Sequence, residues 1–231
     1  MRCFILGVTL SLCLSLQALA QRSPIVVELF TSQGCSSCPP ADAMLHDLAA
    51  REDVIALALH VDYWDYIGWK DEFADPRNAE RQRVYARRAN RRSIYTPEFI
   101  VNGKTEIVGA KPMAVAKAIS AYLAMPETVE VRMIRDGDQV QIEAKALVPL
   151  DYPLDIHLLR YQDSREARIA RGENAGRSFT YANVTEKWQV LEPWDGVLPL
   201  KVSADVPGSL PVVVILQQAN SGLILGAAQV R

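Results

Sequence analysis

The sequence predicts an α/β domain followed by an all-β domain. Two observations support this division. Before about residue 125, long apolar runs alternate with patterns of helical period. After it, apolar and polar residues alternate with the period of two that is typical of strands with one buried face. We therefore predict a first domain over residues 21–125 and a second domain over residues 126–231.

The first domain is predicted to begin with a β-α-β unit. Ile25 to Phe30 and Val54 to Val61 are nearly continuous apolar runs, as expected of strands buried on both faces of a parallel sheet. Between them, apolar residues at i, i+3, i+4 and i+7 spacing predict a helix that packs on one face. These residues are Ala41, Met44, Leu45 and Leu48.

Two further helices are marked by prolines. Asp75 is suited to cap a helix whose first turn holds Pro76, and we expect this helix to run to about Asn90. Another helix is predicted to begin at Pro112. Both positions fit the first turn of a helix, where proline costs no hydrogen bond.

Between these helices the sequence predicts a hairpin. Glu98 to Gly103 and Thr105 to Gly109 are strand-like, and Asn102-Gly103 between them is a strong signal for a tight turn. The predicted order is therefore β-α-β-α-β-β-α, which is the order of a thioredoxin-type domain.

The second domain is predicted to be a β-sandwich. Val129, Val131 and Met133 alternate with polar residues, and Asp136-Gly137 turns the chain back. Short strands at such spacing are typical of a sandwich. The other predicted strands cover Leu154–Tyr161, Ala167–Ala170, Ser178–Asn183, Lys187–Leu191, Leu200–Ala204, Val212–Gln217 and Leu223–Val230.

Residues 1–20 are predicted to be a signal peptide. Arg2 precedes an apolar run from Cys3 to Leu16, and the small residues Ala18 to Ala20 suit cleavage before Gln21. The run is shorter than the ~20 residues that span a bilayer. We therefore expect a periplasmic or secreted protein with no stable membrane anchor. The formal net charge of −2 also argues against a nucleic-acid partner.

Cleavage would leave one close pair of cysteines, Cys35 and Cys38, because Cys3 and Cys13 precede the cleavage site. A bridge over two residues closes a very small loop and stabilises a fold little, which favours chemistry. We predict a thiol–disulfide oxidoreductase in which Cys35 attacks and Cys38 resolves the mixed disulfide. Its partner would be a protein or a small thiol, and the reaction needs no cofactor.

The two prolines after the pair disturb the start of the following helix. Pro39 and Pro40 steer the residues before them away from helical geometry. Either the first turn is distorted, or the regular helix begins at about Pro39 to Pro40. The second option leaves Cys35 about one turn before the helix, so the helix dipole would stabilise its thiolate only modestly.

Two other interpretations of the pair remain open. The disulfide could be an inert local bridge in a non-enzymatic envelope binding module. Alternatively, Cys35 and Cys38 could bind copper or zinc together with His46 or His60. We expect His60, which ends a buried strand, to be a core histidine, and His46 to lie at the surface, so no metal site is predicted. The sequence does not determine the oligomeric state.

Several motifs resemble a secreted bacterial family known as domain of unknown function 1223, which is placed in the thioredoxin-like superfamily. They are VELFTSQGCSSCPPAD, HVDYWDYIGWKD, YTPEFIVNG, GENAGR and PWDG. The resemblance implies that Pro97 takes the cis form and, with Thr96, presents the partner's chain near the disulfide. It also implies that Glu28 is the buried acid that moves the proton of the resolving thiol, although Glu28 lies one residue further from the first cysteine than the pattern has. The alternative is an ordinary glutamate that faces the sheet edge.

The segment from Asp62 to Asp71 follows the second parallel strand, so its start is expected beside the cysteine pair. Trp64 offers an apolar face with a polar tip to a partner, and Asp62 offers a charge. We predict both to bind the substrate; the alternative interpretation is a packed loop that shields the sheet end.

Overall fold

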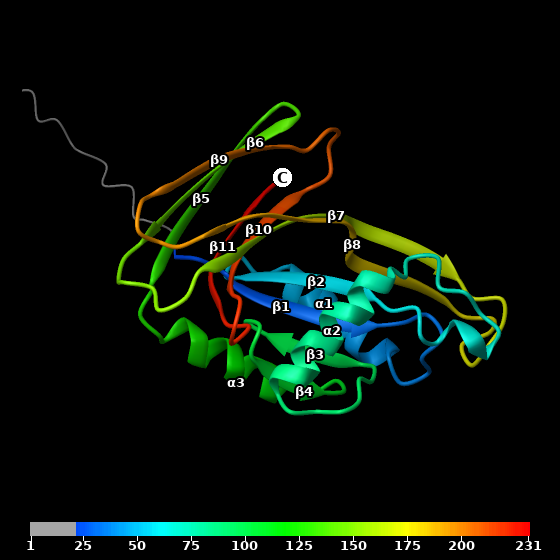
Figure 1. Cartoon of the computed structure of the whole chain (residues 1–231). Helices are drawn as coiled ribbons and strands as arrows, with labels where there is room; N and C mark the ends of the chain where they lie inside the picture. Colours follow the sequence, from blue (N-terminus) through cyan, green and yellow to red (C-terminus); the bar gives the residue numbers. More distant parts are fainter. Residues whose placement is uncertain (1–21) are drawn as a thin grey trace, which may run out of the picture.

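The computed structural model describes residues 22–231, and its strands form one large mixed sheet and one small sheet (Figure 1). The large sheet has the order β11-β10-β7-β8-β2-β1-β3-β4, and the small sheet has the order β5-β6-β9. The predicted signal peptide, with Cys3 and Cys13, lies outside the described residues. No helix of the described part is long and apolar enough to cross a membrane.

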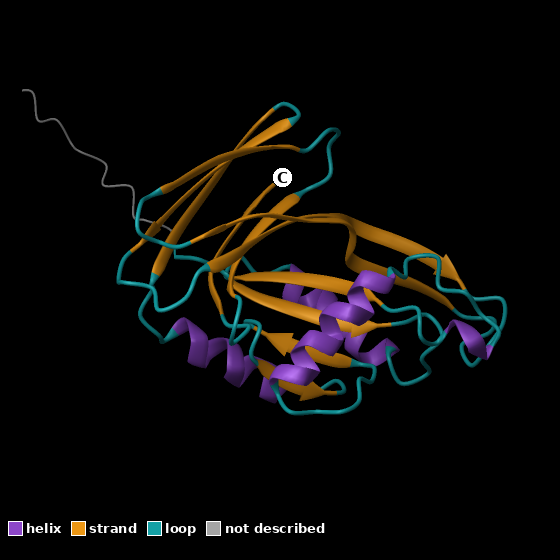
Figure 2. Ribbon diagram, in the orientation of Figure 1, coloured by secondary structure: helices purple, strands orange, loops and turns teal. Residues whose placement is uncertain are grey.

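The first half has the predicted order of elements, with a short 3₁₀ turn, η1 (Asp65–Ile67), after the second strand. Its strands and helices are β1 (Ile25–Thr31), α1 (Pro39–Ala49), β2 (Val54–His60), α2 (Pro76–Arg88), β3 (Glu98–Val101), β4 (Thr105–Val108) and α3 (Pro112–Leu123). β1 pairs with β2 in parallel and with β3 in antiparallel orientation. Figure 2 shows the helices gathered around these strands.

The local signals in this half are confirmed. Asp75 caps α2, and its side chain accepts a hydrogen bond from the backbone N–H of Arg77. Asn102 and Gly103 have φ angles of 51° and 70°, as the tight turn between β3 and β4 requires. Alternate residues of β1 face opposite sides of the sheet. Val27 and Leu29 pack with α1 and α3, whereas Val26 and Phe30 pack with α2.

The second half is all-β, as predicted, but it does not form a separate sandwich, because four of its strands belong to the large sheet and only three form the small sheet. Its strands are β5 (Val129–Asp136), β6 (Gln139–Ala146), β7 (Leu154–Arg168), β8 (Ser178–Trp194), β9 (Leu200–Asp205), β10 (Val212–Gln218) and β11 (Ile224–Val230). β8 joins the free edge of β2 at Ala58 and Val184, so four strands of the second half extend the sheet of the first. An open edge of a sheet offers unpaired backbone groups, which a further strand can satisfy.

A sandwich-like arrangement is present in the outer part of the molecule. The small sheet packs on β7 and β10 through a shared core that includes Val131, Ile142, Leu158 and Val214. Two of the predicted pairs of short strands are in fact single long strands, β7 and β8, which form one hairpin. The predicted boundary between residues 125 and 126 falls between α3 and β5, and it stays a prediction.

Candidate functional site

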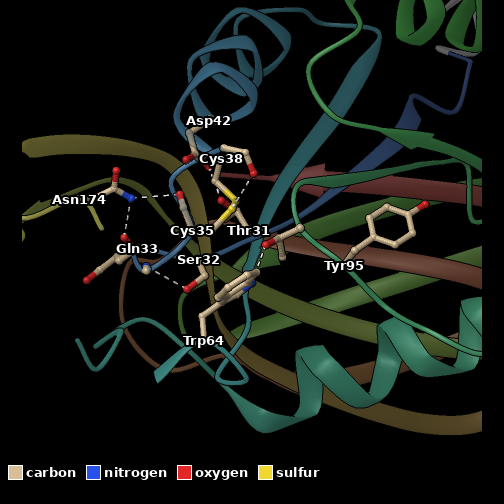
Figure 3. The surroundings of a disulfide bond; sticks show 12 residues. Thr31, Ser32, Gln33, Cys35, Cys38, Asp42, Trp64, Tyr95 and Asn174 are labelled. Carbon is tan, nitrogen blue, oxygen red and sulfur yellow. Dashed lines mark hydrogen bonds between the residues drawn. A yellow bond between two sulfur atoms is a disulfide. The ribbon is translucent and has the colours of Figure 1, made fainter. Parts of the chain in front are cut away.

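Cys35 and Cys38 form a disulfide in the turn between β1 and α1 (Figure 3). The backbone N–H of Cys35 donates to the carbonyl of Ser32, and the N–H of Cys38 donates to the carbonyl of Cys35. The two Cα atoms are 5.4 Å apart, within the usual range for a disulfide. The pair therefore lies at the carboxyl end of the central strand, an edge where open α/β sheets place their sites.

The start of α1 follows the second of the two predicted options. The helix begins at Pro39, with Cys38 as its N-cap residue. No side chain caps this end, and Pro39 has no N–H to leave unpaired. Cys35 therefore lies three residues before the cap, outside the regular helix, where the helix dipole acts only weakly.

The disulfide is almost completely buried. Cys35 is 1% exposed and Cys38 is 0% exposed, although the two serines between them are exposed. The Sγ atom of Cys35 lies 3.4 Å from the Oγ atom of Ser37. A thiolate in solution consequently has no direct path to either sulfur in this conformation.

A buried carboxyl group accompanies the cysteine pair. Asp42 lies four residues after Cys38 on α1, so both side chains lie on the same face of the helix, one turn apart (Figure 3). The hydroxyl group of Thr31 donates to Asp42 over 2.7 Å. Burial raises the pKa of Asp42 to about 6, and the hydrogen bond from Thr31 opposes this rise. Asp42 is not among the site residues that the sequence predicted.

A buried histidine and a buried carboxylate lie in contact behind the turn. The Nδ1 atom of His60 is 2.7 Å from a carboxylate oxygen of Asp71, and the same oxygen accepts a bond from the backbone N–H of Gln33. Burial acts to raise the pKa of Asp71, but the charge of His60 and these hydrogen bonds outweigh it and lower the pKa. The ring of His60 packs edge-on against Phe73 and Tyr181. His60 is therefore a core histidine, as predicted.

The loop after β2 packs against the cysteine turn. A Cβ atom at Gly34 would lie 3.2 Å from Ile67 and 3.3 Å from Trp64, so only glycine fits there without movement. The indole of Trp69 donates to the side-chain oxygen of Gln33 over 2.7 Å. The expected position of this loop beside the pair is confirmed.

The predicted substrate-binding residues Trp64 and Thr96 contact each other, whereas Asp62 is described only by a backbone contact. The indole N–H of Trp64 donates to the hydroxyl group of Thr96 over 2.7 Å, and the Trp64 ring stacks with exposed Tyr66. The Thr96–Pro97 peptide bond is cis, as the resemblance implied. Asp62 is half-buried, and its backbone carbonyl accepts from the N–H of Asp65. The roles predicted for these residues in binding a partner stay predictions.

Glu28 lies on the other face of the sheet from Asp42. Its carboxylate accepts hydrogen bonds from the guanidinium group of Arg81 at 2.5 Å and from the hydroxyl group of Tyr85 at 2.6 Å, both on α2. The side chain is completely buried. Its proton-accepting atoms are thus occupied by partners on α2, an arrangement that does not favour the predicted role toward Cys38.

The second half of the chain also contributes to the site. Asn174, at the tip of the β7–β8 hairpin, donates from its side-chain Nδ2 to the carbonyls of Gln33 at 2.9 Å and Cys35 at 3.0 Å (Figure 3). The tip lies within the GENAGR motif, but no local pattern indicates what the asparagine contacts. This contact joins residues 139 positions apart.

Within residues 22–231, no group of three or more His, Cys, Asp and Glu side chains is arranged to hold a metal ion. A ring nitrogen of His46 is 2.7 Å from the carbonyl of Thr180, so this residue interacts with β8.

A groove of about 800 Å³ lies at the end of β1 and β2 that is opposite to the cysteine turn. It is lined by Arg51, Val54 and Met133 among others.

The fold and the site define the class of this protein: a mixed α/β protein that carries a CxxC disulfide at the end of its central strand. The chain belongs to the family described as protein of unknown function DUF1223, whose model matches residues 26–217. Its structure is similar to the crystal structure of protein AGR_C_4864 from Agrobacterium tumefaciens. The two chains are 33% identical with a TM-score of 0.78, over 91% of this chain and 96% of the other. No curated protein matches the sequence.

Proposed function

We propose that this protein is an exported thiol–disulfide oxidoreductase whose first half is a thioredoxin-like unit. The observation that carries the proposal is the Cys35–Cys38 disulfide at the start of α1, one helical turn from the buried carboxyl group of Asp42. A pKa near neutrality suits a group that must both release and accept a proton.

In the proposed reaction, a partner thiolate attacks the sulfur of Cys35. The bond between the two cysteines breaks, and the sulfur of Cys38 leaves with the electron pair and takes a proton from Asp42. A second partner thiolate then attacks the partner sulfur of the mixed disulfide and releases Cys35, which takes up a proton. The partner loses two electrons and two protons in total, and Asp42 regains its proton from one of these. The reverse direction uses the same groups.

Two measurements on the purified protein test the proposal. We expect the pair to have a reduction potential above about −300 mV and to reach equilibrium with a dithiol buffer. We also expect a Cys38→Ser variant to retain a partner as a mixed disulfide on Cys35. A potential below about −300 mV, without exchange, would exclude the oxidoreductase.

The burial of both cysteines favours a second candidate, a non-enzymatic binding module with a structural disulfide. A structural disulfide typically has a potential low enough to resist reduction by the glutathione pool. The same potential measurement therefore distinguishes the two candidates.

A further inference from the structure

The tip of the β7–β8 hairpin, residues 171–177, covers the cysteine turn with a single side chain. Asn174 is 1% exposed, whereas each of the other six residues of the tip is exposed. Its two hydrogen bonds to the carbonyls of Gln33 and Cys35 are the hydrogen bonds that join the tip to the first half in the described part of the chain.

The remaining hydrogen bonds of the tip stay within the hairpin. The backbone N–H of Ile169 donates to the carbonyl of Arg177, and the N–H of Gly176 donates to the carbonyl of Ile169. The Arg177 side chain donates to the Oδ1 atom of Asn174 over 3.1 Å. Movement of the tip as a unit therefore breaks these two hydrogen bonds and separates Gly172 from Ile67 and Trp69, which lie close to it. Segments that are exposed and held by few contacts are those that open most readily.

The cysteine turn, in contrast, keeps its own supports when the tip moves. Gln33 is also bonded to Asp71 and Trp69 of the loop after β2, and neither bond involves the hairpin. Opening would consequently expose the turn without dismantling it.

We propose that residues 171–177 form a cap that regulates access to the Cys35–Cys38 disulfide, with Asn174 as its latch. The cap deepens the proposed function, on which its biological role rests. A partner that exchanges disulfides here must displace the cap or wait for it to open. Exchange then proceeds at the rate of the exposed disulfide multiplied by the fraction of molecules that are open.

The test uses a water-soluble trialkylphosphine, whose reaction is irreversible and therefore independent of the reduction potential. The phosphine supplies two electrons, takes its oxygen from water, and the two protons of that water complete the two thiols. Free thiols are alkylated at successive times and counted by intact mass. An oxidised peptide with the sequence Gly-Cys-Ser-Ser-Cys-Pro provides the rate of an uncapped disulfide.

The cap predicts that the protein reacts at least tenfold more slowly than the peptide. Since each neutral hydrogen bond shifts an equilibrium by about twofold to tenfold, Asn174→Ala should react about tenfold faster than the wild type. Asn174→Asp, which keeps the size but cannot donate to the two carbonyls, should be accelerated similarly. This second variant serves if the first does not fold.

Asn183 provides a matched control. Like Asn174 it is a buried asparagine, but it lies within β8. Its Nδ2 atom donates to the carbonyl of Ala56, in the middle of β2, over 2.8 Å. Its φ angle of 49° suits glycine, so Asn183→Gly removes this bond without backbone strain. We expect this variant to react at the wild-type rate.

Three outcomes would overturn the cap. The wild type and the Asn174 variants could be reduced by the phosphine at equal rates, or the Asn183 variant could be accelerated as much as the Asn174 variants. The third outcome is a wild-type rate equal to that of the peptide. A low potential without exchange would instead exclude the oxidoreductase while leaving these rate ratios valid. The two proposals therefore fail in distinguishable ways.

Discussion

Glu28 and Asp42 are two buried carboxyl groups on opposite faces of the same sheet, and their surroundings differ in charge. Glu28 accepts hydrogen bonds from a guanidinium group and a tyrosine hydroxyl group. Asp42 has one side-chain hydrogen bond in the described part of the chain, from a threonine hydroxyl group. The free-energy cost of burying a negative charge is thus compensated by the guanidinium group of Arg81 at Glu28, and it is largely uncompensated at Asp42.

The difference separates a structural carboxyl group from one that is suited to transfer a proton. A buried ion pair keeps its charges fixed, because removal of either partner leaves the other uncompensated in a medium of low polarity. A buried carboxyl group without a bonded cation changes its protonation near neutral pH instead. We therefore assign the proton-transfer role of the proposed reaction to Asp42 and a structural role to Glu28.

The largest expected effect comes from a substitution that breaks the ion pair between Glu28 and Arg81 on the α2 face. Glu28→Gln leaves Arg81 buried without its counter-charge and should lower the free energy of unfolding by about 3–5 kcal/mol. The measurement is urea denaturation at pH 7. Glu80→Gln is the control, since Glu80 pairs with Arg83 and Arg87 on the exposed side of the same helix. Equal losses in the two variants would show that burial of the pair at Glu28 has no special cost.

On the α1 face, replacing the buried carboxyl group by an amide should raise the free energy of unfolding, whereas Glu28→Gln lowers it. The rise of the Asp42 pKa from 3.8 to about 6 means that the folded protein keeps this proton where the unfolded chain has lost it. Stability therefore falls as the pH rises from about 4 to about 6, by an amount on the order of 3 kcal/mol. Asp42→Asn has no charge to bury, so it should be more stable than the wild type at pH 8 by about this amount.

At pH 3.5 the advantage of the Asp42→Asn variant should nearly vanish, because the wild-type carboxyl group is then mostly neutral in both the folded and the unfolded state. Denaturation midpoints measured from pH 3.5 to pH 8 test this. Asp47→Asn, on the exposed side of α1, is the control and should change little with pH. A variant that is less stable than the wild type at pH 8 would contradict the proposed environment of Asp42.

The same variant should slow the proposed chemistry. Without a carboxyl group beside Cys38, the departing thiolate has no local proton donor, and general acid catalysis is typically worth about 10²-fold or more. We expect a loss on the order of 10²-fold in exchange with a dithiol, measured in the Asn174→Ala background so that cap opening does not limit the rate. Glu28→Gln in that background should exchange at the rate of its parent, and the reverse ranking would return the role to Glu28.

Much of this contrast could be predicted from the sequence, because it depends on short-range rules. The cysteine turn, the start of α1 and the tight turn at Asn102 each follow from residues close together in the chain. The spacing of four residues between Cys38 and Asp42 is also a local signal that a carboxyl group lies one helical turn from the pair. Alternation along β1 likewise places Glu28 and Thr31 on opposite faces.

Other features could not be predicted, because they depend on how distant strands meet. The period of two reports which residues of a strand are buried, but it does not identify the neighbouring strand. The pairing of Ala58 with Val184 is therefore not encoded locally, although it joins the two halves into one sheet. The contact of Asn174 with Cys35 joins residues equally far apart in the chain, so it also could not be predicted from local patterns.

The smallest expected effects come from removing one hydroxyl group on each face of the sheet, that of Thr31 beside Asp42 and that of Tyr85 beside Glu28. Thr31→Val keeps the shape of the side chain but removes the hydrogen bond to Asp42. Since bonds to charged groups are worth about 1.5–3 kcal/mol and neutral bonds about 1 kcal/mol, the loss should be larger at pH 8 than at pH 4. The pKa of Asp42 should rise further, because this bond now opposes the effect of burial.

Tyr85→Phe removes a hydroxyl group from Glu28 in the same way, but Arg81 still holds that carboxylate. We expect its loss of stability to be constant between pH 4.5 and pH 8. Denaturation of both variants across this range gives the comparison directly. A pH-dependent loss in Tyr85→Phe, together with a constant loss in Thr31→Val, would reverse the assignment of the fixed and the titrating carboxyl groups.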